Sequence, residues 1–564
     1  MLSRHLAVLS AIEDELRARV GVAADTLGGD GTAAPSVSLG PTRDPLHGDF
    51  ATAVALAAGK AWRVNPMDVA AAIASRGAAG MAGVAKIDVA KPGFLNFRMA
   101  PDFWTGVVKE ALERGESYGT SDALAAHGPL LVEFTSPNPT GPLVVVQGRS
   151  GSLGATLVAM FRFAGAKTEA ETYVNDAGNQ LDTLADSLFA RYATLCGVET
   201  PVPEDGYPGD YLIDVARRLR ERDGDRWLSA PFDERRRALG RFGRDLIVEG
   251  QRQDMERFGV HFDRWFSEAS LHESGKIEAV LELLTSSGHA YVKDDALFLK
   301  STEFGDEKDR VLRRSDGRPT YLAADAAYHR DKLERGNAYL LNILGPDHHG
   351  YIARLKALVA ALGHPGSLEV LLAQQVTLKR GDEVVKMSKR AGNVITLADV
   401  MDEVGVDAAR FFFINRAPES HLVFDLELAL EQSAKNPVYY VQYGHARIAS
   451  ILRRASAPEH AQSLERARRG DDLAALAHPA EFALIRRIAD YERTVVDAAR
   501  ARAPHRVAEF ARDLATDFHA FYTDCVVLGD DAGITSARLS LCIVAKTALA
   551  SALKLLGVSA PEKM

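Results

Sequence analysis

Cysteine is scarce in this sequence of 564 residues, which holds only Cys196, Cys525 and Cys542. The three lie far apart and form no CxxC pair, which argues against a zinc site built from paired cysteines. We therefore expect no metal site made of protein side chains. Scattered thiols without a disulfide framework are typical of a reducing compartment, so we expect a cytoplasmic location.

Long hydrophobic runs and an excess of positive charge are also missing. No uninterrupted apolar stretch reaches the length of about 18 residues that indicates a membrane span. The first residues are amphipathic rather than a signal-peptide block, so we expect no membrane partner. Because the net charge is −9, a nucleic-acid partner would have to be bound by local basic patches.

The composition is otherwise that of a globular protein, with 47% hydrophobic and 25% charged residues. One hydrophobic core stops growing at about 250–300 residues, so about two to four domains are expected. Changes in pattern suggest a small α+β unit over residues 1–108, an α/β unit over residues 109–425 and a nearly all-helical unit over residues 426–564.

Local patterns predict the elements of these units. Apolar residues from Leu6 to Leu16 have the spacing of a helix face, and a Pro-Gly turn at residues 92–93 predicts a hairpin. The other elements predicted in the first unit are helices over residues 51–60 and 66–75 and strands over residues 87–90 and 94–97.

The second unit begins as strand, loop, helix and strand, the pattern of a parallel nucleotide-binding sheet. The predicted elements are strands over residues 130–134, 167–174 and 339–344 and a helix that ends near residue 164. Residues from about 185 to 300 are predicted to form a helical insertion. Because ligands bind at the carboxyl ends of parallel strands, the loops over residues 133–138 and 345–349 are candidate sites.

The strongest chemical signal is a compact basic loop in which Lys386, Met387, Ser388 and Lys389 are consecutive. Two ammonium groups three residues apart can stabilise the charge that develops on the departing pyrophosphate of ATP. Taken alone, the loop could also be a solvated basic turn.

This loop resembles the KMSKS-type loop of class I aminoacyl-tRNA synthetases. The flanks of their second signature, the HIGH tetrapeptide, match residues 137–149, but the tetrapeptide itself is Val144-Val145-Val146-Gln147. Both histidines are absent, and Val146 stands where glycine lets adenine approach. Gln147 can still donate an amide hydrogen bond, and the helix N-terminus can bind phosphate. We expect an altered but working ATP site; an inactive relative is the alternative.

Among class I enzymes, the chain resembles the arginyl-tRNA synthetases. The matching stretches are residues 47–52, 173–180, 302–310, 321–325, 344–350 and 436–443. The resemblance implies an α/β fold: a Rossmann-like catalytic domain, an α+β N-terminal domain that also contacts tRNA, and an all-α C-terminal anticodon-binding bundle.

A guanidinium is a planar fork of donors that carboxylates hold best. By resemblance, Asp325 is the carboxylate on the guanidinium side, and Tyr321 stacks or hydrogen-bonds beside it. The other residues expected to hold arginine are Glu133, Ser136, Asn138, Asn175 and Gln180.

The resemblance also assigns the ATP site. Gly345 and Asp347 are expected at the ribose, and Met387 with the two loop lysines at the remainder of the nucleotide. Lys386, Lys389, Ser388 and Gln147 are the expected catalytic group. Mg²⁺ should be needed to neutralise the ATP phosphates, although the sequence shows no dedicated site for it.

For tRNA, aromatic faces beside basic residues suit unpaired bases and phosphates. Tyr439, Tyr443 and Arg447 form such a group in the helical unit. By resemblance, Phe94 and Asn96 contact the tRNA elbow, one by stacking and one by hydrogen bonds. The alternatives are core tyrosines and a hairpin aromatic with a capping asparagine.

Together these features predict an enzyme that attaches L-arginine to tRNA(Arg) through arginyl-adenylate, releasing AMP and pyrophosphate. The expected protein is a monomer without a DNA partner. The rival hypotheses are a tRNA-binding protein without catalysis and a ligase for another amino acid.

Overall fold

The computed structural model describes residues 3–28, 35–42, 44–385 and 395–564. Its first unit packs helices on an antiparallel sheet of order β1-β2-β4-β3. The strands are β1 (Gly40–Pro41), β2 (Phe50–Thr52), β3 (Val84–Ala90) and β4 (Phe94–Met99), and the helices are α1 (Arg4–Leu27), α2 (Val54–Trp62), α3 (Pro66–Ala74) and α4 (Pro101–Arg114).

The predicted first helix and hairpin of this unit are confirmed. The helix predicted from residue 51 begins only at Val54, because residues 50–52 pair with β4 instead. Helix α3 begins where a sequence signal places it: Asn65 accepts a hydrogen bond from the Met67 amide, and Pro66 occupies the first turn, where no backbone donor is needed.

A five-stranded parallel sheet lies at the centre of the molecule, in the order β12-β11-β5-β6-β7. Its strands are β5 (Leu130–Glu133), β6 (Thr168–Val174), β7 (Arg264–Ser267), β11 (Tyr339–Leu344) and β12 (Leu368–Leu372). Helix α5 (Val145–Phe163) connects β5 to β6. A Cβ added at Gly154 would lie 2.1 Å from the Phe134 ring, so glycine lets α5 pack directly on the end of β5. The α/β fold class is confirmed.

The predicted helical insertion over residues 185–300 needs a correction. Helices α6 (Asn179–Leu195), α7 (Tyr211–Asp223), α8 (Arg226–Ser229) and α9 (Phe232–Arg257) do form, but edge strand β7 of the central sheet follows them within this range. Strand β7 has four residues, too few for a clear periodic pattern. The elements that follow are α10 (Ala269–Glu273), α11 (Lys276–Ser286), β8 (Ala290–Lys293), β9 (Ala296–Leu299), β10 (Arg310–Arg313), α12 (Tyr321–Glu334) and α13 (Ile352–Ala361).

After the central sheet, a smaller sheet of order β14-β13-β15 leads into the C-terminal helices. Its elements are β13 (Val376–Arg380), β14 (Glu383–Val384), α14 (Leu397–Val404), α15 (Val406–Ile414), β15 (Leu422–Asp425) and α16 (Leu426–Leu430). The predicted helical unit is confirmed as α17 (Pro437–Ala455), α18 (Pro458–Arg469), α19 (Pro479–Ala489), α20 (Tyr491–Arg500), α21 (His505–Asp524) and α22 (Ala532–Leu556).

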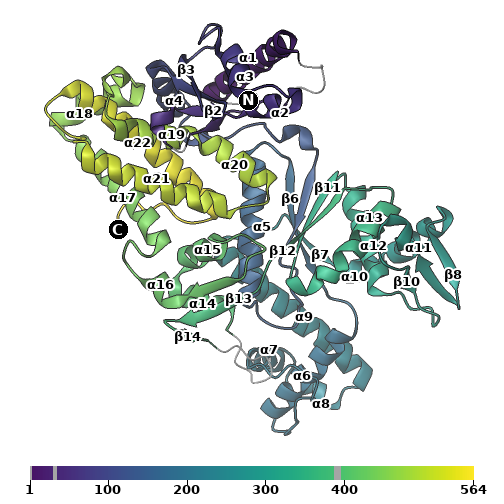
Figure 1. Ribbon diagram of the computed structural model, residues 1–564. Helices are drawn as coiled ribbons and strands as arrows, with labels where there is room; N and C mark the ends of the chain where they lie inside the picture. Colours follow the sequence, from purple (N-terminus) through teal and green to yellow (C-terminus); the bar gives the residue numbers. More distant parts are fainter. Residues whose placement is uncertain (1–2, 29–34, 43, 386–394) are drawn as a thin grey trace.

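Among the described residues, α22 alone is long and apolar enough to cross a membrane by length and composition. Most of its apolar window, 67%, is buried in the bundle, as in the core helix of a folded domain. In Figure 1 the purple N-terminal unit lies against the yellow helices of this bundle, and α6–α8 project at the opposite end of the molecule.

Candidate active site

A cavity of about 750 Å³ lies at the carboxyl ends of β5, β6 and β11. The structure brings together here six of the residues singled out from the sequence: Ser136, Asn138, Gln147, Asn175, Gly345 and Asp347. They come from loops more than 200 residues apart, which meet because parallel strands end at the same edge of a sheet.

The N-terminus of α5 forms one wall of this cavity through Val144, Val145, Val146 and Gln147. The side-chain oxygen of Gln147 accepts a hydrogen bond from the Val144 amide at 2.9 Å and so caps the helix. No described residue is hydrogen-bonded to the Gln147 Nε2 atom, which leaves that amide as a donor beside the cavity. The substituted tetrapeptide therefore keeps one side-chain donor at the helix start.

The glycine predicted at the ribose lies directly against Asp347. A Cβ at Gly345 would lie 2.6 Å from a carboxylate oxygen of Asp347, so a larger residue there would push this side chain aside. The Asp347 side chain is 80% exposed, and its carboxylate lies 3.9 Å from the His348 imidazole. Its carboxylate is thus open to a ligand.

Glu133, expected to hold arginine, has a carboxylate that is hydrogen-bonded to protein side chains. Lys332 Nζ donates to it at 2.6 Å and the Ser136 hydroxyl at 3.0 Å, and both Glu133 and Lys332 are buried. Burial by itself would raise the pKa of Glu133, but the Lys332 ammonium outweighs it and holds this pKa below its usual range. The Glu133 carboxylate thus holds Ser136, which lines the cavity, through a hydrogen bond.

The predicted amides are also linked to one another. Gln180 Nε2 donates to the backbone oxygen of Asn175 at 2.7 Å, and Asn175 Nδ2 approaches the Asn138 side-chain oxygen at 3.5 Å. Asn138 and Asn175 line the cavity, whereas Gln180 lies at the start of α6 and holds the loop behind them.

Beside the cavity, Tyr173 connects to a pair of acidic side chains, Asp325 and Glu268. Burial, together with the nearby Glu268 and Asp325 carboxylates, raises the pKa of the Tyr173 hydroxyl. Burial raises the pKa of Glu268 to about 7, and Asp176 adds to the shift. Burial likewise raises the pKa of Asp325 to about 6, with further increases from Glu133 and Glu268. A cation bound beside these two carboxylates would stabilise their charged forms.

Sequence reasoning missed Glu268, which directly follows β7. Its backbone amide donates to the Val174 oxygen at 3.0 Å, so it sits at the sheet edge where the other site loops end. A predicted strand just before Glu268 would have pointed to this residue, but β7 is short and lies within the region expected to be helical.

The tyrosine expected beside Asp325 is also different from the one found. Tyr321 is 75% exposed at the first turn of α12, and the hydroxyl of Tyr351 donates to Asp325 instead. A one-turn spacing places Tyr321 and Asp325 on the same helix face, but burial of that face begins only after residue 321.

The basic loop cannot be placed. Lys386, Met387, Ser388 and Lys389 lie outside the described residues, which end at Val385 and resume at Ile395. Among the residues that the structure does describe, no cluster of three or more His, Cys, Asp or Glu side chains could hold a metal ion.

The predicted tRNA contacts divide into accessible and inaccessible ones. The Tyr439 and Tyr443 rings stack with centroids 6.1 Å apart, and the Arg447 guanidinium lies 4.9 Å from the Tyr443 ring. Tyr443 and Phe94 are each 37% exposed. Asn96, in contrast, is 8% exposed in the middle of the sheet, where it pairs with residues 51 and 88.

Comparison with known proteins identifies the family. Three family models match: the arginyl tRNA synthetase N terminal domain over residues 8–99, the catalytic domain of tRNA synthetases class I (R) over residues 232–448, and the DALR anticodon binding domain over residues 441–564. The chain is 46% identical to an arginine–tRNA ligase of Desulforudis audaxviator, over 100% of both chains. It is 45% identical to that of Heliobacterium modesticaldum over 94% of each.

A solved structure of Thermus thermophilus arginyl-tRNA synthetase has the same fold, with a TM-score of 0.74 at 24% identity over 98% of this chain and 100% of that one. The parallel sheet, the acidic pair at its carboxyl edge and the full-length identity lead to one conclusion: the chain belongs to the arginyl-tRNA synthetase family of class I.

Proposed function

We propose that this protein uses ATP to activate L-arginine and transfers it to tRNA(Arg), with AMP and pyrophosphate as the other products. The observation that carries the proposal is the pair Asp325 and Glu268. Burial raises the pKa of both carboxylates, and no Lys or Arg side chain among the described residues forms an ion pair with either one. A guanidinium placed between them would supply that positive charge and several donors.

The neighbouring cavity would hold the nucleotide. Val146 and Gly345 face it from two sides, and Asp347 offers a carboxylate for ribose hydroxyls. The α5 N-terminus would direct its backbone amides at the phosphates, and Gln147 Nε2 would add one more donor. Asn138 and Asn175 would hold the polar end of arginine between the acidic pair and ATP.

In the first step, the arginine carboxylate attacks the α-phosphate of ATP, and pyrophosphate leaves. In the second, a terminal ribose hydroxyl of tRNA attacks the activated carbonyl, and AMP leaves. Neither step needs a protein nucleophile, so positioning and charge stabilisation supply the rate. We assign the stabilisation of the leaving pyrophosphate to Lys386 and Lys389, with Ser388 and Met387 beside them.

The remaining assignments extend this proposal. Since the described residues offer no acidic cluster for a metal, Mg²⁺ would arrive bound to the ATP phosphates. Residues 1–108, 109–425 and 426–564 would be the N-terminal, catalytic and anticodon-binding domains of a cytoplasmic monomer. Phe94 would contact the tRNA elbow, and Tyr439, Tyr443 and Arg447 the anticodon, through base stacking and phosphate pairing.

The test is ATP–pyrophosphate exchange and tRNA charging with the purified chain. We expect exchange that depends on arginine and is measured with tRNA(Arg) present, and charging that prefers arginine over lysine and glutamine. Tight tRNA binding without exchange would favour the rival, a tRNA-binding protein that has lost catalysis, for which Val144 and Val146 are the motivation. Preference for another amino acid would overturn the assignment of the substrate.

A further inference from the structure

The segment His47–Thr52, one of the stretches that match the family, lies away from the active-site cavity, and its Asp49 joins two parts of the molecule. Asp49 lies before β2 in the N-terminal unit and is 5% exposed. One carboxylate oxygen accepts from the Met99 amide at 2.7 Å. The other accepts from Arg486 Nε at 2.9 Å and lies 2.8 Å from Arg486 Nη2. Arg486 belongs to α19, more than 400 residues later.

The backbone is shaped to present this carboxylate. Gly48 has a φ of +95°, and a Cβ there would lie 2.7 Å from the Phe97 carbonyl oxygen. The Asp49 amide donates to that same oxygen at 2.7 Å. Asp49 is therefore held on β4 from both its amide and its carboxylate, with one oxygen left for α19.

On the other side, aromatic packing fixes Arg486. Its guanidinium lies 5.3 Å from the centre of the Trp104 ring, and Trp104 stacks on Phe50 at 6.1 Å. The neighbouring Arg487 lines the same junction cavity as Arg486 but pairs within the bundle, with Asp513 and Asp517. Adjacent arginines on α19 thus have different partners: one in the N-terminal unit and one within the bundle.

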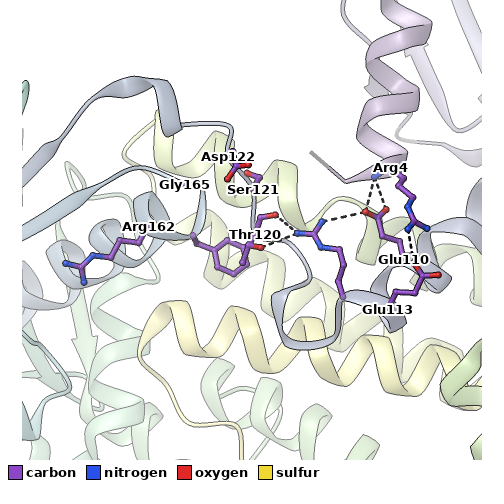
Figure 2. Close-up of a pocket in the computed structure, with 10 residues that line it drawn as sticks. Arg4, Glu110, Glu113, Thr120, Ser121, Asp122, Arg162 and Gly165 are labelled. Atoms are coloured by element: carbon purple, nitrogen blue, oxygen red, sulfur yellow. Dashed lines mark hydrogen bonds and ion pairs between the residues drawn. The ribbon is translucent and has the colours of Figure 1, made fainter. Parts of the chain in front are cut away.

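Apolar residues of α4 pack against α19 and α22 at this junction, and further polar contacts lie beside them. His5 Nε2 lies 2.9 Å from the Ala489 oxygen, and the Tyr118 hydroxyl donates to the Ile488 oxygen at 3.0 Å. A cavity of about 510 Å³ lies near the same junction. Arg4 lies beside Glu113 in its lining (Figure 2), and Arg114 pairs with Glu110 and donates to the Thr120 backbone oxygen. Since each of these arginines already has an acidic partner, the cavity has no spare charge for an anion.

We propose that Asp49 and Arg486 are positioning residues for tRNA, which clamp the N-terminal unit to the anticodon-binding bundle so that both contact one tRNA in a fixed relative orientation. The inference rests on the proposed function. Two linked sites bind one ligand more tightly than either alone, provided their geometry suits both contacts at once. A preset orientation also removes the ordering cost of binding. Loosening the clamp would therefore weaken tRNA binding and leave the small-substrate sites unchanged.

The test compares Arg486→Gln with Arg487→Gln as a matched control. Both arginines lie on α19 with similar side-chain exposure, 33% and 32%. We expect Arg486→Gln to raise KM for tRNA(Arg) by about tenfold, a typical coupling between sites, and to leave KM for arginine and ATP within about twofold at saturating tRNA. Arg487→Gln should leave all three values near those of the unaltered protein.

A rescue experiment separates positioning from simple loss of stability. Asp49→Asn alone places an amide donor against the guanidinium and should also raise KM for tRNA. In the double variant Asp49→Asn with Arg486→Gln, the side-chain oxygen at position 486 can accept a hydrogen bond from the side-chain NH2 group at position 49. We expect its KM for tRNA to be no higher than that of either single variant, whereas independent effects would multiply to about 100-fold.

Three outcomes would overturn the clamp: equal KM for tRNA in Arg486→Gln and Arg487→Gln, a multiplied defect in the double variant, or a fall in kcat with no change in KM. If Arg486→Gln fails to fold, Arg486→Lys keeps the charge but loses the two-donor fork, and the same comparison applies. An unaltered protein that charges no tRNA would refute the proposed function, whereas normal charging with no effect of the variants would refute only the clamp.

Discussion

Replacing Asp325 by asparagine is the most direct test of how the site recognises arginine, because it removes one charge and keeps the shape. The Asp325 carboxylate accepts a hydrogen bond from the Tyr351 hydroxyl, and burial raises the pKa of Asp325 to about 6. Truncating one partner of a buried charge pair costs about 2–5 kcal/mol. Since Asp325 is only partly buried and Glu268 remains, we expect about 2–3 kcal/mol, which corresponds to about 30- to 150-fold in KM for arginine.

The assay is steady-state ATP–pyrophosphate exchange with saturating tRNA, with arginine and ATP varied in turn. KM for ATP should change by less than about threefold. Glu334→Gln, on the same helix α12 but exposed and paired only with Arg330, is the control and should leave both values unchanged. Equal increases in KM for arginine and ATP would remove Asp325 from the guanidinium site.

Four further predictions follow from the described contacts. The folded pKa of Glu268 is about 7 against an ordinary value of 4.5, so its contribution to stability is full below about pH 4.5 and is lost as pH rises through 7. Glu268→Gln should therefore stabilise the protein without arginine by about 1–3 kcal/mol at pH 8 and hardly at pH 4.5, as measured by urea unfolding. The same variant should raise KM for arginine. Lys332→Met leaves the buried Glu133 carboxylate unpaired and should lower the free energy of unfolding by about 3–5 kcal/mol; an unchanged urea midpoint would contradict the buried pair. Gln147→Glu keeps the oxygen that caps α5 but removes the Nε2 donor, so kcat for exchange should fall about 10- to 100-fold with helix content preserved in circular dichroism. Tyr443→Ala should weaken tRNA(Arg) binding in a filter assay by about 1–3 kcal/mol and Tyr443→Phe far less; equal losses would point to the hydroxyl, which bonds Arg447, rather than the ring.

Much of the architecture could be predicted from local patterns. The strands at residues 130–133 and 339–344 are short apolar runs, and the helical C-terminal unit has periodic apolar stripes. Family motifs pointed to the loops at residues 136–138 and 345–347 as site loops. These loops lie together because the carboxyl ends of parallel strands meet at one edge of the sheet.

Local sequence patterns are therefore sufficient to predict the order and type of most elements and the parallel sheet, since these depend on neighbours along the chain. Which charged groups face each other became known only from the folded protein. Lys332 occupies the Glu133 carboxylate, Tyr351 rather than Tyr321 reaches Asp325, and Arg486 meets Asp49 across more than 400 residues. The physical reason is that a side chain's charge state and accessibility depend on burial and on through-space partners, which sequence spacing does not encode.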